Sequence, residues 1–138
     1  MRPAARGAQV LPLQTDEDVV RLRKAVRDQM VAMRFSLIEQ TKTVTAASEL
    51  ARNTLRYGGG GEGHVLVLSQ GSRQGIEITF TDDGPGIADI ALALTDGYTS
   101  GGGMGLGLSG AKRLSDEFEL DTAAGAGLTV TIRKWKPF

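Results

Sequence analysis

The hydrophobic positions in the first half of the chain recur at the spacing of an α-helix. Residues 10–13 form a short apolar run that could be a first strand. After it, apolar side chains recur every three or four positions from residue 19 to residue 33, which predicts a helix with one buried face. Thr15 and the three carboxylates that follow it favour a helix start there. A second periodic segment begins after Ser36, a favourable N-cap residue, and ends at the four glycines that follow Tyr57. One stripe of this second helix is expected to be buried: Leu37, Thr41, Val44, Ser48, Ala51 and Leu55.

The pattern then changes to the alternation of a β-strand. Apolar and polar residues alternate over residues 76–81, and residues 64–70 form a similar run before a glycine-containing turn. Nine glycines between residues 84 and 110 interrupt the pattern. Beyond them we expect a helix over residues 106–118 and strands over residues 119–122 and 128–134. This order predicts an α+β fold, a two-layer α/β sandwich in which helices cover one face of a mostly antiparallel sheet.

The length of 138 residues corresponds to one domain. We expect residues 1–8, which are small and basic, to be a disordered tail, and residues 9–138 to form the domain. The chain has no cysteine and one histidine, which argues against thiolate catalysis, disulfide scaffolds and Cys- or His-rich metal sites. The cations near the C-terminus, Arg133, Lys134 and Lys136, are expected to form a solvated end.

The charge balance and the hydropathy exclude two classes of partner. Sixteen basic and sixteen acidic residues give a net charge of zero, so no overall basic field attracts nucleic acid or anionic lipid. No apolar run approaches the roughly 20 residues of a membrane span, and the N-terminus lacks the apolar core of a signal peptide. We therefore expect a cytoplasmic protein without nucleic-acid or membrane partners.

Three short segments carry residue types that could perform chemistry. Glu49 and Asn53 are four residues apart, so they project from the same face of the second helix, where their oxygens could share a divalent cation. Asp82 follows a strand and precedes Gly84 and Gly86, and its carboxylate could accept a hydrogen bond from an exocyclic amine. Each feature alone is also compatible with an exposed helical pair or an ordinary turn.

The third segment is the glycine-rich stretch over residues 101–110, which leads into a predicted helix. Main-chain N–H groups at a helix N-terminus favour anions, so this stretch could bind phosphate, although a flexible linker has the same composition. No lysine follows the glycines as in a P-loop, and no parallel βαβ unit surrounds them as in a dinucleotide-binding fold.

Together and in this order, the three segments resemble the Bergerat-fold (GHKL) ATP-binding superfamily of histidine-kinase catalytic domains, gyrase-type ATPases and Hsp90. The matching segments are ASELARN (47–53), DDGPGI (82–87) and GMGLGL (103–108). The finer resemblance, carried also by residues 96–108 and 110–120, is to anti-sigma-factor-type serine/threonine kinases and in particular to RsbT-like switch kinases.

This resemblance implies a role for each matching residue. Asn53 would be the magnesium ligand, Glu49 the general base, and Asp82 the partner of the adenine amine in a pocket shaped by Gly84 and Gly86. The main chain of a lid would wrap the phosphates of ATP; the lid residues are Gly103, Met104, Gly105, Leu106, Gly107 and Leu108. One position departs from the family pattern, because Leu128 stands where the family usually has Thr, and Thr129 comes one residue later.

The resemblance implies an ATP- and Mg²⁺-dependent serine/threonine protein kinase that acts as a partner switch. Its substrates would be STAS-domain antagonist proteins, and once released it would bind and activate a serine phosphatase in a sigma-factor or stress-response pathway. Two alternatives stay open: an anti-sigma factor that mainly sequesters a sigma factor, and an ATP-sensing binding module with little transfer activity. The sequence also leaves a homodimer open, while the absence of phosphoacceptor-histidine helices disfavours a sensor histidine kinase.

Overall fold

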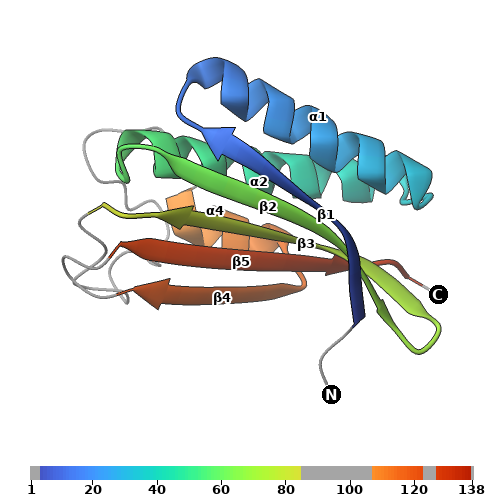
Figure 1. The fold of residues 1–138 in the computed structure, drawn as a ribbon. Helices are drawn as coiled ribbons and strands as arrows, with labels where there is room; N and C mark the ends of the chain where they lie inside the picture. Colours follow the sequence, from blue (N-terminus) through green and yellow to red (C-terminus); the bar gives the residue numbers. More distant parts are fainter. Residues whose placement is uncertain (1–3, 85–106, 123–126, 138) are drawn as a thin grey trace.

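The computed structural model describes residues 4–84, 107–122 and 127–137. In this part of the chain five strands form one antiparallel sheet, and helices cover one of its faces (Figure 1). The strands are β1 (Ala4–Leu13), β2 (Gly61–Gln70), β3 (Arg73–Asp82), β4 (Glu117–Thr122) and β5 (Leu128–Trp135), and the helices are α1 (Asp16–Ala32), α2 (Leu37–Arg56) and α4 (Gly107–Leu114). The sheet order β1-β2-β3-β5-β4 places β3 at the centre. This architecture confirms the predicted two-layer α+β sandwich.

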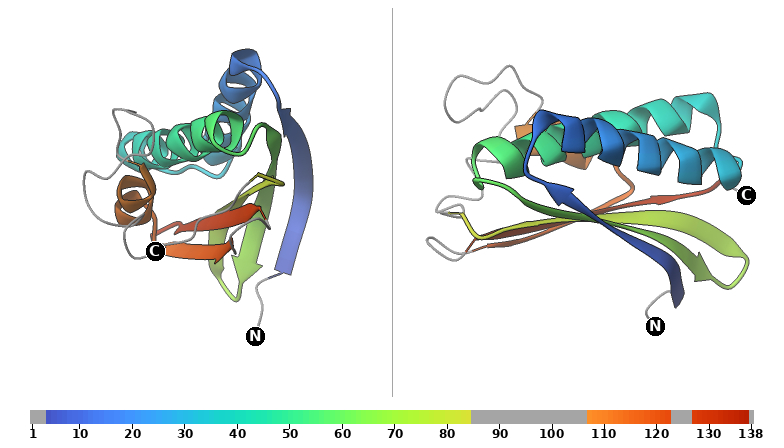
Figure 2. Two further views of the ribbon diagram at one scale, coloured as in Figure 1. Left: turned by 90° about the vertical axis from the view of Figure 1, so that its left-hand side faces the viewer. Right: turned by 45° about the horizontal axis from the view of Figure 1, so that its top comes forward.

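The two long helices begin where their capping residues predict. The Thr15 hydroxyl accepts the Asp18 N–H at 3.2 Å, and the Asp18 carboxylate accepts the Thr15 N–H at 3.1 Å, which makes a reciprocal capping box. The Ser36 hydroxyl accepts the Glu39 N–H at 3.2 Å at the start of α2. The helices then lie side by side on the sheet (Figure 2).

The core lies between the helices and the sheet. Alternation along β3 buries Ile76, Ile78 and Phe80 against the helices, as the period-2 pattern predicts. α1 contributes its three- and four-residue apolar stripe, and α4 contributes Leu108 and Ala111. None of the described helices has the length and hydropathy needed to cross a bilayer.

Four sequence predictions need correction. The first strand begins at Ala4, not near residue 10, because the edge of β2 pairs with residues that carry no alternating pattern; residues 4–8 are therefore strand and not disordered tail. α4 ends at Leu114, and Phe118, expected in the helix, lies in β4 with its side chain packed against the core. Leu37 and Thr41, both expected on the buried stripe of α2, are exposed, Leu37 to 69%, because the buried apolar residues of this helix begin only at Val44.

The predicted solvated end of β5 is the fourth correction. Lys134 lies on the helix-facing side of the strand, in phase with Ile132, and its Nζ binds Glu39 of α2 at 2.7 Å and Asp116 at 3.2 Å. Arg133 lies on the opposite face, where its guanidinium binds Glu77 at 2.7 Å. Lys134 therefore ties β5 to α2, Arg133 ties β5 to its neighbouring strands, and neither forms a solvated end.

Candidate nucleotide and catalytic site

Helix α2 presents Glu49 and Asn53 from the side that the core does not cover. Leu50, Ala51 and Thr54 alternate with them along the helix and are buried, so the packing fixes the rotation of α2. Glu49 keeps 24% of its side-chain surface exposed. The structure thus places both residues on one accessible side of α2, one turn apart, as their spacing predicts.

The Glu49 carboxylate is held by a neighbour on its own helix. Arg52 lies three residues further along, and its Nη1 donates to Glu49 Oε1 at 3.1 Å. Such a pair limits the rotamers of the carboxylate at a site where its position matters. No sequence signal singles out Arg52, although it stands inside the same motif.

Asn53 has a second function in the main chain. Its carbonyl oxygen accepts the N–H groups of Tyr57 at 2.9 Å and Gly58 at 3.3 Å, which ends α2. Its side-chain amide makes no hydrogen bond within the described residues and is only partly buried. The amide is therefore available to a ligand.

The end of α2 brings Gly58 directly against Asp82, the last residue of β3. A Cβ atom built on Gly58 would lie 2.5 Å from Oδ2 of Asp82, so only glycine fits at this position beside the carboxylate. The other carboxylate oxygen, Oδ1, accepts the Gly84 N–H at 2.9 Å. The helix that carries Glu49 and Asn53 is thereby tied to the carboxylate expected to bind adenine.

Burial raises the pKa of the Asp82 carboxyl above its ordinary value, and the charge of Asp83 adds to the rise. The main-chain N–H groups of Gly84 and Leu128 act in the opposite direction, because they stabilise the ionised form. The Asp82 carboxylate is thus partly buried and held in place by main-chain N–H groups. Such a carboxylate is suited to accept a hydrogen bond from an amine of a ligand.

Gly127 is a third glycine that lies directly against Asp82. Gly127 has φ +79, and a Cβ there would collide with the Asp82 carbonyl oxygen. Its N–H donates to the Gly84 carbonyl at 3.0 Å, so the strand-end turns after β3 and before β5 are joined. Sequence reasoning does not find Gly58 and Gly127, because their necessity arises from contacts between segments far apart in the chain.

The register of the sheet shows which residue shares the Asp82 face. Leu128 is the direct cross-strand partner of Asp82, whereas Thr129 pairs with Thr81 and therefore lies on the opposite face. Thr129 therefore does not lie on the Asp82 face, where the family resemblance would place a threonine. The next position across the sheet on the Asp82 face is Thr122, whose hydroxyl donates to the Gly127 carbonyl at 2.6 Å.

The predicted lid falls mainly on residues that the structure does not describe. Gly86, Gly103, Met104, Gly105 and Leu106 all lie outside the described residues. Gly107 is the first residue of α4, and the Leu108 side chain is buried in the core. The Leu108 side chain therefore packs in the core and does not face a ligand, which leaves only its main chain for the predicted role.

The donor set of these residues fits an Mg²⁺–nucleotide ligand better than a metal ion alone. No group of three or more His, Cys, Asp or Glu side chains gathers within the described residues. Mg²⁺ usually takes one or two protein oxygens and fills its remaining positions with phosphate and water. The available amide of Asn53 and the nearby carboxylate of Glu49 match that requirement.

The comparison with known families agrees with this geometry. Residues 38–137 match the family described as histidine kinase-, DNA gyrase B-, and HSP90-like ATPase. The chain belongs to this family. The match contains α2, Asp82 and the last hairpin, and it confirms the resemblance expected from the three motifs.

A curated relative refines the assignment. The chain is 38% identical over 123 residues to the serine/threonine-protein kinase RsbT of Bacillus subtilis (strain 168), covering 89% of this chain and 92% of that protein. This similarity over nearly the whole of both chains places the chain among the serine/threonine protein kinases, as the sequence predicted.

A solved structure shares the fold. The crystal structure of the RsbU and RsbW domains of Rv1364c from Mycobacterium tuberculosis matches 99% of this chain with a TM-score of 0.62 and 18% identity. The chain spans about a third of that protein, 34% of its length.

Proposed function

We propose that the chain is an ATP- and Mg²⁺-dependent kinase that phosphorylates serine or threonine on a STAS-domain antagonist protein. The observation that carries the proposal is the convergence of the two motifs: α2 presents Glu49 and Asn53, and its end packs Gly58 against Asp82. The similarity to RsbT, a serine/threonine-protein kinase, supports the reaction class.

In this proposal each residue acts through groups that lie in or beside the site. Asp82 would accept a hydrogen bond from the adenine amine, the Asn53 amide oxygen would hold Mg²⁺, and Glu49 would accept the proton of the attacking hydroxyl. When bound, Mg²⁺ would neutralise charge on the phosphates, and phosphoryl transfer requires little else beyond positioning. Arg52 positions Glu49, to which its guanidinium donates at 3.1 Å.

The lid residues Gly103–Gly107 of the motif are proposed to close over the phosphates with their N–H groups. Gly107 opens α4, where the helix dipole favours an anion. With Leu128 in place of threonine on the Asp82 face, recognition of the base depends more heavily on Asp82 itself.

We further propose that the chain is a cytoplasmic partner switch. It would be held by the STAS-domain protein until that protein is phosphorylated, and would then bind and activate a serine phosphatase. The similarity to RsbT supports a regulator of this kind.

The switch is tested by a competition experiment with purified proteins. A STAS-domain protein encoded beside this chain's gene and a candidate serine phosphatase are mixed with the chain, and complexes are separated by size before and after Mg-ATP is added. We expect the chain to move from the STAS protein to the phosphatase upon phosphorylation. Retention on a sigma factor, with no phosphatase complex at any stage, would favour a sequestering anti-sigma factor instead.

A further inference from the structure

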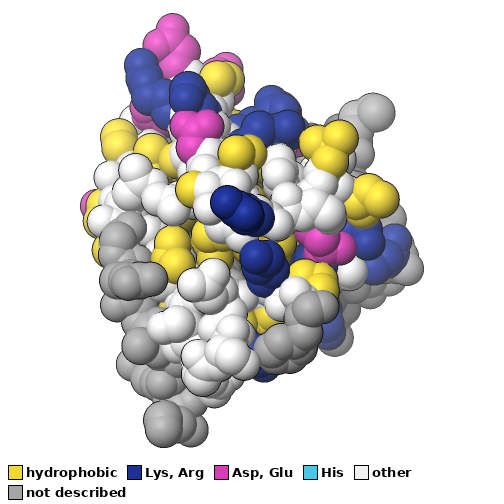
Figure 3. Space-filling model, turned by 90° about the vertical axis from the view of Figure 1, so that its right-hand side faces the viewer, with side chains coloured by type: hydrophobic (Ala, Val, Ile, Leu, Met, Phe, Trp, Pro, Cys, Tyr) yellow, Lys and Arg dark blue, Asp and Glu magenta, His cyan; other side chains and the backbone are white. Residues whose placement is uncertain are grey.

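Large apolar side chains are exposed at the end of the molecule where α1 turns into α2. Val31 is 56% exposed, Leu37 69% and Ile38 67%, and they lie within eight residues of one another in the chain. Figure 3 views this end and shows hydrophobic side chains interspersed with Lys and Arg side chains. We call Val31, Arg34, Leu37 and Ile38 the hairpin tip.

The charges around the hairpin tip are unbalanced. Between residues 27 and 42, Arg27, Arg34 and Lys42 are exposed and form no ion pair within the described residues. The two acids of the same segment are already neutralised, because Asp28 binds Lys24 at 2.7 Å and Glu39 binds the buried Lys134 at 2.7 Å. A chain with zero net charge therefore presents an excess of positive charge at this end.

Arg34 occupies a backbone conformation that normally selects glycine. Its φ is +64, and it is the one non-glycine residue with positive φ in the described chain. The bonds Phe35 N–H to Met30 C=O and Arg34 N–H to Val31 C=O, both 3.0 Å, form a Schellman motif in which glycine is preferred at this position. An arginine there is unfavourable for folding, which suggests that its side chain serves a purpose other than stability.

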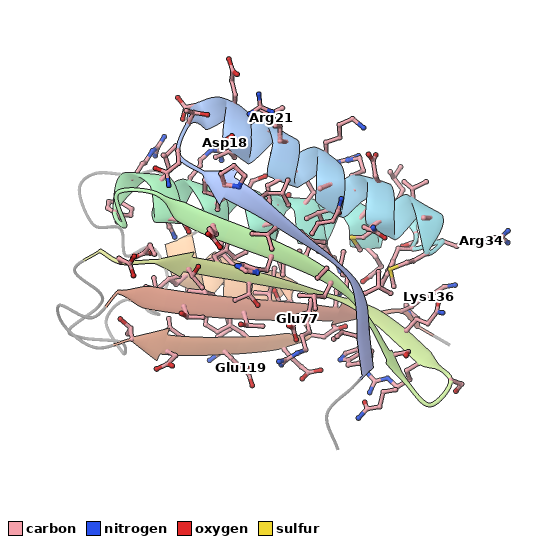
Figure 4. All side chains as sticks on the ribbon, viewed as in Figure 1. Asp18, Arg21, Arg34, Glu77, Glu119 and Lys136 are labelled. Atoms are coloured by element: carbon pink, nitrogen blue, oxygen red, sulfur yellow. The ribbon has the colours of Figure 1, made fainter. Side chains whose placement is uncertain are left out.

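The hairpin tip is remote from the candidate catalytic residues. Ile38 and Asn53 are fifteen residues apart on α2, so at 1.5 Å per residue they are separated by about 22 Å along the helix axis. Figure 4 places Arg34 and Lys136 together at this end of the molecule, away from the Asp82 end of the sheet in Figure 1. A protein bound at the tip would leave the nucleotide site uncovered.

From these observations we propose that the hairpin tip is a docking surface for a protein that is not the phosphorylated substrate. The occupant is the serine phosphatase of the proposed function, on which this inference rests, and it contacts the tip with acidic residues around apolar ones. Charge complementarity selects an acidic partner, and the exposed aliphatic side chains supply the desolvated centre of the contact. The separation of about 22 Å between Ile38 and Asn53 along α2 keeps the tip away from the proposed general base.

The test measures the affinity of the purified phosphatase for wild-type chain and for two tip variants. Arg34→Gly should bind at least fivefold more weakly while its melting temperature rises by about 3 °C, because glycine relieves the strained backbone. The double variant Leu37→Ser with Ile38→Ser should bind at least tenfold more weakly. Val10→Ser, at an exposed aliphatic position on β1, is the matched control and should bind like wild type.

Kinase activity toward the STAS-domain protein is measured in parallel and should be unchanged in all variants. Full phosphatase affinity in both tip variants would overturn the docking proposal, and so would a loss of affinity for the STAS protein or of self-association alone. If the wild-type chain binds neither protein, the proposed function fails and removes the occupant with it. These outcomes separate a failure of the tip from a failure of the proposed function.

Discussion

The Asp82 carboxylate packs directly on the main chain of Gly58, leaving no room for a side chain between them. This contact joins the end of the helix that carries Glu49 and Asn53 to the strand end expected to bind the base. The geometry of the candidate site therefore depends on a glycine that touches no ligand in the proposed mechanism.

Gly58→Ala should weaken ATP binding at least tenfold. The new methyl group must displace either the Asp82 carboxylate or the end of α2, and overpacking of this kind costs about 1–3 kcal/mol of folding free energy. Gly59→Ala is the matched control, since Gly59 has φ +75 but a methyl group there would meet no atom within 4 Å, so this variant tests backbone strain alone. Calorimetry on both variants checks the prediction; equal ATP affinities for the two would show that the contact is unimportant.

Asp82→Asn should change both the pH dependence of stability and the binding of ATP. Because the folded state raises the pKa of Asp82 above 3.8, it holds the proton more tightly than the unfolded state. The contribution of this group to the free energy of unfolding is therefore greatest at low pH and decreases as pH rises through the two pKa values. In the Asp82→Asn variant, the free energy of unfolding should no longer fall with pH through this group. The variant should also lose ATP binding.

Urea titrations of the nucleotide-free protein between pH 3 and pH 7 measure this pH dependence. Asp83→Asn provides a graded control, because removal of its charge should reduce the effect on Asp82 without abolishing it. A wild-type profile in which the Asp82 contribution grows with pH would contradict the assigned direction.

Arg52→Ala should lower the turnover number about tenfold while the dissociation constant for ATP stays the same. The Arg52 guanidinium limits the rotamers of Glu49, and a general base that is no longer held in position is a less efficient catalyst. Arg52→Lys, which retains a donor of the same charge, should recover part of the rate. A parallel loss of ATP affinity in Arg52→Ala would indicate a contact with nucleotide instead.

Lys134→Ala should destabilise the fold by about 1–3 kcal/mol, because it leaves the part-exposed carboxylates of Glu39 and Asp116 without their shared cation. Burial acts to lower the pKa of Lys134, but its bonds to Glu39 and Asp116 outweigh this effect and raise the pKa above 10.5. The contribution of Lys134 is thus complete below pH 10.5 and is lost as pH rises through the folded value.

Denaturant unfolding of Lys134→Ala beside Lys136→Ala checks this prediction. Lys136 makes no ion pair within the described residues, so its removal should change the free energy of unfolding by less than about 0.5 kcal/mol. Equal effects of the two substitutions would contradict a structural role for the Lys134 bridge.

The sequence predicts well the features that local periodicity or local capping determines. Both long helices and the alternation of β3 follow from residue spacing, as does the placement of Glu49 and Asn53 on one side of α2. The family could also be predicted, because its three motifs are short and ordered, and residues 38–137 confirm it.

The sequence could not predict features that distant segments impose on each other. The strand over residues 4–8 exists because β2 offers an unpaired edge, and Lys134 is buried because α2 places Glu39 opposite it. In the sequence Gly58 is one of four consecutive glycines, and only the folded structure shows that it lies against Asp82. The roles of the site residues remain predictions that mutagenesis must test.

The central claim is tested most directly by transfer of labelled γ-phosphate from Mg-ATP to the STAS-domain protein, with wild type and Glu49→Gln. Calorimetry on both proteins first establishes that each binds Mg-ATP with similar affinity. We predict label on serine or threonine of the STAS protein with wild type, and at least a hundredfold slower transfer with Glu49→Gln. Transfer at the wild-type rate by Glu49→Gln, or none by a wild-type chain that binds ATP, would contradict the proposed mechanism.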